Sequence, residues 1–177
     1  MFLDAMPGGF IYPQPEDDED TRILAHVNRK GWHNLAVPPA EGEPGYSFTL
    51  GHFLNCDHPE LVLMGLKAEL ASRMLDAAAV RVRDMGERLQ PHREYPDFLP
   101  GLTVAFLPVE FAFYGQYLGY ANWFYEHLPL PYPALQMVWP DGRGVFPWQP
   151  GYDARFRRLQ PLLGMTPSPA QQATRLQ

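Results

Sequence analysis

The sequence lacks several features that would assign it to a functional class. Its only cysteine is Cys56, so no disulfide can form within the chain, which favours a reducing compartment. It has no run of lysine and arginine, and its formal net charge of −6 argues against a nucleic-acid-binding surface. No apolar run approaches the roughly 18 residues of a membrane span, and residues 1–15 do not resemble a signal peptide. We therefore expect a cytoplasmic protein that binds neither nucleic acid nor membranes.

The familiar catalytic signatures are also missing. The chain contains no phosphate-binding GxxxxGK(S/T) loop, no HExxH and no CxxC. The segment Gly45–Thr49 approaches a nucleophile elbow, but it has Thr49 where the motif needs glycine and lies within a strand pattern. The sequence therefore offers no complete active-site motif.

What the chain has in quantity is hydrophobic and aromatic side chains, together with 20 prolines and 15 glycines in 177 residues. Such a composition suits one core built from short elements and turns, and it argues against a helical bundle. We predict a single α+β domain, with a mainly antiparallel sheet of about five or six strands packed with two or three helices. The predicted domain spans 18–163, between an irregular N-terminal arm (1–17) and a flexible C-terminal tail (164–177).

Hydrophobic periodicity and turn residues place the elements along the chain. Helical spacing predicts helices over 18–30, 67–86 and 114–128, the last of them densely aromatic. Apolar runs predict strands over 32–37, 46–50, 61–66 and 102–107, the second and third of which form a hairpin-like unit around a short loop. The dipeptide Asp141-Gly142 between two apolar runs predicts a further hairpin of strands 135–139 and 145–148.

The loop that follows residue 50 holds the best concentration of metal-ligand chemistry. His52, Cys56 and His58 offer imidazole and thiolate groups that suit zinc or another divalent transition metal. Structural zinc sites usually take paired ligands from two separate segments, whereas these residues come from one loop. The favoured interpretation is that His58 and Glu60 bond to backbone groups of the turn and that Cys56 packs as a small hydrophobe.

The aromatic residues are open to three interpretations. Tyr117 and Trp123 on the predicted helix 114–128, together with Trp139, suit core packing, a partner-binding face or the wall of an apolar pocket. Apolar stripes most often serve packing, so the core is the favoured interpretation.

Several short motifs occur in the order found in a known family. They are Gly31-Trp32, Tyr46–Gly51, His58–Val62 leading to Gly65-Leu66, and Gln136–Asp141 with Phe146–Trp148. Together they resemble the bacterial domain of unknown function DUF4262 over about residues 20–163. The resemblance implies a small intracellular α+β domain with no established activity, and it carries over no catalytic residues. His52 departs from the leucine expected after Gly51, and Cys56 lies outside the shared motif, which counts against a metal site.

The matching positions include polar groups from two separate segments. Thr49, His58 and Glu60 belong to the first, and Trp139 and Asp141 to the second. If the two segments meet in space, these residues would mark a binding site.

Three functions remain open. The first is a non-catalytic protein-binding module of immunity or adaptor type, acting on another protein or as a homodimer, because the chain is acidic and rich in aromatics. The second is an enzyme in which His58 exchanges protons with Glu60 or Asp141 as its partner. The third is a metal protein that uses His52, Cys56 and His58. The sequence indicates no particular cofactor.

Overall fold

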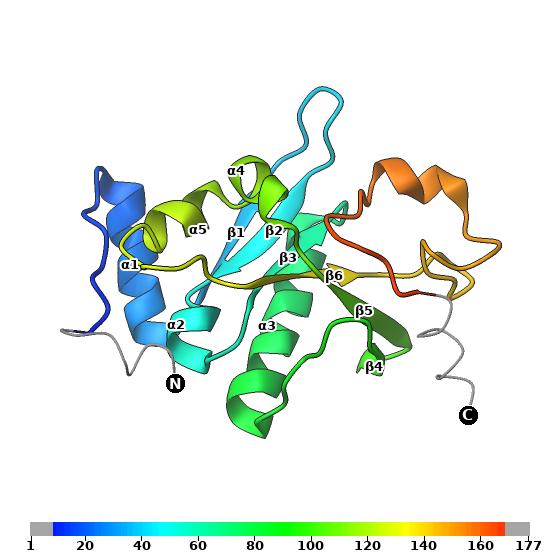
Figure 1. Ribbon diagram of the computed structural model, residues 1–177, viewed down its shortest axis with the longest axis horizontal. Helices are drawn as coiled ribbons and strands as arrows, with labels where there is room; N and C mark the ends of the chain where they lie inside the picture. Colours follow the sequence, from blue (N-terminus) through cyan, green and yellow to red (C-terminus); the bar gives the residue numbers. More distant parts are fainter. Residues whose placement is uncertain (1–8, 169–177) are drawn as a thin grey trace.

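The computed structural model describes residues 9–168, which form a six-stranded sheet with helices packed on it (Figure 1). The strands are β1 (His33–Val37), β2 (Tyr46–Leu50), β3 (Glu60–Met64), β4 (Glu94–Leu99), β5 (Leu102–Pro108) and β6 (Ala134–Val138). Their order in the sheet is β1-β2-β3-β6-β5-β4, and all neighbours are antiparallel except β3 and β6. The predicted α+β domain with a mainly antiparallel sheet is confirmed.

Two long helices and several short ones accompany the sheet. They are α1 (Asp18–Lys30), α2 (His52–Cys56), α3 (Ala68–Met85), α4 (Tyr114–Tyr117) and α5 (Gly119–Phe124), with 3-10 turns η2 (Phe111–Phe113) and η3 (Ala154–Arg158). The predicted helices 18–30 and 67–86 correspond to α1 and α3. Within residues 9–168, no helix is both long and apolar enough to cross a membrane.

Helix α1 has a clear start, stop and buried side. The carboxylate of Asp17 accepts a hydrogen bond from the backbone N–H of Asp20 at 2.8 Å, and Gly31 closes the helix with a φ of 98°. Ile23 and Val27 are buried against the sheet, four residues apart on one face. The remaining surface of α1 is left for polar side chains.

The core lies on both faces of the sheet. Alternate residues of β3 point to opposite sides, so Val62 and Met64 pack with α1, α4 and α5, whereas Leu61 and Leu63 pack with α3. Figure 1 shows α3 on one side of the strands and α4 and α5 on the other. The segment after β6 returns to cover β5 and β6, where Phe146 is buried.

The structure describes only part of the predicted arm and of the predicted tail. Residues 1–8 of the predicted arm and 169–177 of the predicted tail lie outside the described residues. Leu163 is buried, and its carbonyl accepts a hydrogen bond from the backbone N–H of Glu110 at 2.8 Å. Gly164 lies so close to Pro108 that an added Cβ would stand 1.8 Å from the Pro108 carbonyl oxygen. The chain therefore remains packed on the end of β5 through residue 164.

The predicted hairpin of strands 135–139 and 145–148 is wrong in its second half. Residues 134–138 form β6, but 145–148 form no strand. The physical reason is that β6 is a central strand with β3 on one side and β5 on the other, so it has no free edge. The Asp-Gly signal marks a turn that Asp141 holds through its side chain.

Three other parts of the prediction need correction. The predicted helix 114–128 is split into α4 and α5 at Leu118, where φ is −124° and ψ is 33°. Gly119 follows at once, and glycine weakens a helix interior. The predicted loop 52–58 contains α2, and β4 was not predicted, because Pro96 and a bulge interrupt its apolar alternation.

Candidate functional site

The motif residues Thr49, Gly51 and Glu60 meet at a carboxylate that has no contact with solvent. Glu60 is 0% exposed, and its Oε2 accepts a hydrogen bond from the Thr49 hydroxyl at 2.6 Å. Its Oε1 accepts bonds from the backbone N–H groups of Gly51 at 2.9 Å and Phe53 at 3.1 Å, and from the Tyr125 hydroxyl. We call these five residues the Glu60 cluster. It joins β2, α2 and β3 to the end of α5.

The electrostatics of the Glu60 cluster indicate a structural carboxylate. Burial raises the pKa of Glu60, and the hydrogen bonds from Thr49, Tyr125, Phe53 and Gly51 oppose that shift. Burial also raises the pKa of Tyr125 well above its usual value, so its hydroxyl remains a donor. All four neighbours donate, and the cluster is closed to a substrate. Its chemistry therefore serves the fold.

A substitution of Gly51 tests how tightly the Glu60 cluster is built. Gly51 has a φ of +103°, and an added Cβ would lie 2.7 Å from the Gly31 carbonyl oxygen and 2.8 Å from Cγ1 of Val27. We expect Gly51→Ala to lower the free energy of unfolding by about 2 kcal/mol, measured by urea denaturation. Gly142→Ala is the control, because a Cβ there meets nothing within 4 Å. Equal stability of the two variants would contradict this description.

His58 binds backbone groups on both sides of its ring. Its Nε2 lies 3.2 Å from the backbone N–H of Leu89 and must accept that bond, so Nδ1 carries the proton and donates to the Pro59 carbonyl at 2.9 Å. Burial lowers the pKa of His58, which keeps the ring neutral. Among the described residues, His58 has no hydrogen bond with Glu60 or Asp141. The acid-base pairing required by the enzyme hypothesis is therefore absent from this geometry.

His52 and Cys56 do not form a metal site with His58 here. His52 is 0% exposed and packs edge-on against Trp32 and His58, with ring centroids 5.9 and 6.2 Å away. Burial raises the pKa of the Cys56 thiol to about 11, which disfavours the thiolate that a metal needs. Within residues 9–168, no three histidine, cysteine or acidic side chains are grouped so that they could hold a metal ion.

His52 should make the protein sensitive to acid. Neither ring nitrogen has a hydrogen-bond partner in the described part of the chain, and burial lowers the pKa of His52 to about 3. An unfolded histidine takes up a proton near pH 6.5, so the unfolded state binds more protons between about pH 6.5 and 3. This group therefore contributes a loss of stability as the pH falls through that window.

The variant His52→Leu should remove this acid-linked loss. Leucine is similar in size and has no polar atom to leave unpaired, so we expect higher stability at pH 7.5. At pH 5 the advantage should grow by about 2 kcal/mol, because one fewer proton is taken up on unfolding. Urea denaturation at the two pH values measures both effects. A variant less stable than wild type would mean that the His52 nitrogens are well paired in solution.

The side chains of Trp139 and Asp141 are used in hydrogen bonds with backbone groups. The indole N–H of Trp139 donates to the Met64 carbonyl at 2.9 Å. The Asp141 carboxylate accepts from the backbone N–H groups of Arg143, Val145 and Asp153 at 2.9, 3.0 and 3.0 Å. Trp139 and Asp141 also line a pocket of about 490 Å³, to which Thr49, His58 and Glu60 do not contribute. The two polar segments singled out in the sequence therefore do not form one site.

The aromatic residues mostly fill the core. Tyr117 is buried, and its hydroxyl donates to Glu43 at 3.3 Å; Trp123 is half-buried with its ring edge-on to Tyr120. The large hydrophobic residues exposed in the described part of the chain include one aromatic, Phe111. Residues 9–168 therefore present no broad exposed patch of tyrosine and tryptophan to serve as a partner-binding face.

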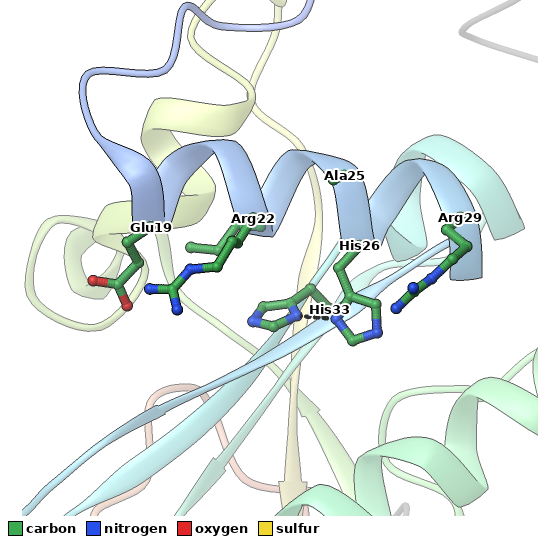
Figure 2. A pocket seen from close by; sticks show the side chains of 7 residues that line it. Glu19, Arg22, Ala25, His26, Arg29 and His33 are labelled. Carbon is green, nitrogen blue, oxygen red and sulfur yellow. Dashed lines mark hydrogen bonds between the residues drawn. The ribbon is translucent and has the colours of Figure 1, made fainter.

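A polar groove that was not predicted lies along α1. Figure 2 shows Arg22, His26 and Arg29 projecting from one face of α1, next to His33 at the start of β1. These side chains and Glu19 line a groove of about 630 Å³, which we call the α1–β1 groove. The Nδ1 atoms of His26 and His33 lie 2.6 Å apart. The spacing of residues 22, 26 and 29 is readable as one helix face, but the contact with His33 depends on how the chain turns back.

The arginines dominate the charge of the α1–β1 groove. Burial lowers the pKa of His33 to about 4, and burial together with Arg29 lowers the pKa of His26, so both rings are neutral near pH 7. Arg22 and Arg29 are exposed, and neither forms an ion pair or hydrogen bond within residues 9–168. Two free guanidinium groups beside neutral imidazoles can bind carboxylate or phosphate oxygens.

Comparison with known proteins gives one match. A protein-family model, the domain of unknown function DUF4262, matches residues 26–153. The matched range contains all six strands and the whole Glu60 cluster, but it begins within α1 at His26, after Arg22. No curated protein and no solved structure matches the chain significantly.

Proposed function

The chain belongs to the DUF4262 family, and for this member we propose a non-catalytic interaction module that binds an acidic segment of a partner protein in the α1–β1 groove. The observation that carries the proposal is a pair of exposed arginines, Arg22 and Arg29, which have no ion-pair partner within residues 9–168 and lie beside two neutral histidines. The Glu60 carboxylate is fully buried, so it offers no competing site.

The shape of the α1–β1 groove favours a protein segment over a small molecule. Pockets for small molecules usually enclose most of the ligand, whereas this groove is formed by one helix and His33 and is open on its outer side. Arg22 and Arg29 are seven positions apart on α1, which is about 10 Å along a helix. In an extended segment, acidic side chains two and four residues apart lie on one face and are separated by about 7 and 13 Å, which brackets this distance. Such a segment can engage both arginines at once.

Because the whole chain is acidic, only the basic residues in the groove can attract an acidic segment. The formal net charge is −6, so an acidic partner is repelled at long range and is held only by the basic residues in the groove. Exposed charges interact over roughly 10 Å at 0.1 M salt, and added salt screens them further. The proposed binding should therefore be weak and strongly dependent on salt.

A peptide titration tests the proposal. The probe is a fluorescently labelled peptide of six aspartates, titrated with the full chain at low salt and followed by fluorescence anisotropy. We expect saturable binding that weakens as salt is added, and no comparable binding of a labelled peptide of six serines. Failure of the aspartate peptide to bind at low salt would contradict the proposal.

Glu19 should act as an internal competitor at one end of the groove. Figure 2 shows its carboxylate on the same side of α1 as the Arg22 guanidinium, although the two do not form an ion pair. Removing the negative charge with Glu19→Gln should raise the affinity for the aspartate peptide about threefold, as expected for one exposed charge interaction. Glu41→Gln, an exposed loop position, is the control for net charge. An equal gain in both variants would show that Glu19 has no special position.

A further inference from the structure

The histidine pair lies between the two arginines of the α1–β1 groove (Figure 2). We propose that the groove binds its acidic ligand together with one proton, which His26 and His33 share, so that affinity rises as the pH falls. This inference rests on the proposed function and specifies how that site is regulated.

The geometry of the pair sets its proton capacity. With the two Nδ1 atoms 2.6 Å apart, only one proton can lie between them, so one ring donates and the other accepts. A further proton can bind an outer Nε2, because the inner contact is then an imidazolium–imidazole hydrogen bond, which is stronger than a neutral one. A second added proton would place two N–H groups against each other. The pair can therefore take up one proton without breaking its contact.

Charges on α1 oppose that proton in the empty groove. Arg22 and Arg29 flank the pair, and neither is neutralised by an ion pair in the described structure. Arg29 is among the groups that lower the pKa of His26, in addition to burial. Glu19 lies at the Arg22 end of the groove and is the one acidic residue of its lining.

The other charges near the pair belong to one ion pair. Lys30, at the end of α1, lowers the pKa of both histidines. Asp76, on α3, raises the pKa of His26, and it is bound to the Lys30 ammonium at 2.8 Å. This ion pair is internal to the protein, so a ligand in the groove does not change it. The arginines are the charges that a ligand can neutralise.

Binding of an acidic group and binding of the proton should therefore support each other. A carboxylate seated on Arg22 and Arg29 neutralises Arg29, which lowers the pKa of His26, and adds a negative charge beside the pair. Neighbouring opposite charges shift pKa values by about one unit or more. One unit corresponds to about a tenfold gain in affinity once the pair is protonated. By thermodynamic linkage, the ligand raises the proton affinity of the pair by the same factor.

The test measures the affinity of the aspartate peptide for the full chain at pH 7.5 and 5.5, at constant ionic strength. The aspartates stay ionised over this range, because their pKa is about 3.9. We expect affinity to rise measurably from pH 7.5 to 5.5 in the wild type, by less than the tenfold limit, because the lowered pKa values leave the pair only partly protonated at pH 5.5. In His33→Phe and in His26→Gln this rise should disappear. His127→Gln, which removes an exposed histidine outside the groove, should behave as wild type.

Nitrogen-15 shifts of the histidine rings provide an independent readout. In the wild type, addition of the peptide at pH 6 should move the ring nitrogens of His26 and His33 toward the imidazolium values. Peptide binding with the same pH dependence in wild type and both groove variants would overturn the proton coupling and leave the proposed function intact. Absence of peptide binding at either pH would overturn both.

Discussion

Replacing Glu60 with alanine should lower the free energy of unfolding by about 4 kcal/mol. The substitution removes the shared acceptor of the Thr49 and Tyr125 hydroxyls and of the backbone N–H groups of Gly51 and Phe53 at a fully buried position. Each buried donor left unpaired costs about 1–3 kcal/mol, and relaxation of the cavity recovers part of the sum. Urea denaturation monitored by tryptophan fluorescence measures the difference.

Two further variants separate the role of Glu60 from a general effect of losing a carboxylate. Glu60→Gln keeps the shape and one acceptor oxygen, so we expect a smaller loss of about 2 kcal/mol. Glu41→Ala removes an exposed carboxylate and should leave stability within about 0.5 kcal/mol of wild type. If Glu60→Ala were as mild as Glu41→Ala, the buried carboxylate would not hold β2, α2, β3 and α5 together as described.

Reversing both arginine charges of the α1–β1 groove should weaken binding of the aspartate peptide about thirtyfold. In Arg22→Glu/Arg29→Glu, two attractive contacts become repulsive, at a cost of about 1 kcal/mol each. The fold should be unaffected, because both side chains are exposed and unpaired within residues 9–168. Fluorescence anisotropy at low salt gives the affinity, and circular dichroism checks the fold.

The matched control is Arg73→Glu/Arg158→Glu. Both arginines are exposed, neither lines the groove, and the double variant changes net charge by the same amount. We expect it to lose affinity less than threefold, through the overall field alone. Equal losses in the two double variants would mean that the peptide responds to net charge and not to the groove.

The sequence allowed much of the fold to be predicted because its local signals agree with the tertiary structure. Asp17, the buried Ile23 and Val27, and Gly31 all define α1, and the alternation in residues 46–50 defines β2. The Asp141-Gly142 signal misled because a hairpin also needs a free strand edge, and β6 has none. Strand order is a property of the whole sheet and cannot be read from the turn.

The candidate sites were predictable only in part. Thr49 and Glu60 were singled out by the sequence and do meet, but two of their partners are backbone groups, and Tyr125 comes from a distant segment. The spacing of Arg22, His26 and Arg29 places them on one face of a helix, which the sequence alone indicates. What the sequence did not reveal is that none of these side chains would form an ion pair within residues 9–168, or that His33 would reach His26. Both depend on the path of the chain from α1 into β1.

The most direct test of the central claim is to map the bound peptide on the protein. The measurement is a series of nitrogen-15 correlation spectra of the full chain during titration with the aspartate peptide at low salt. We predict that the largest shift changes cluster on the outer face of α1, around Arg22, His26 and Arg29, and at His33. Changes centred on the other basic cluster, Arg155, Arg157 and Arg158 in η3, with none along α1, would contradict the assignment of the groove.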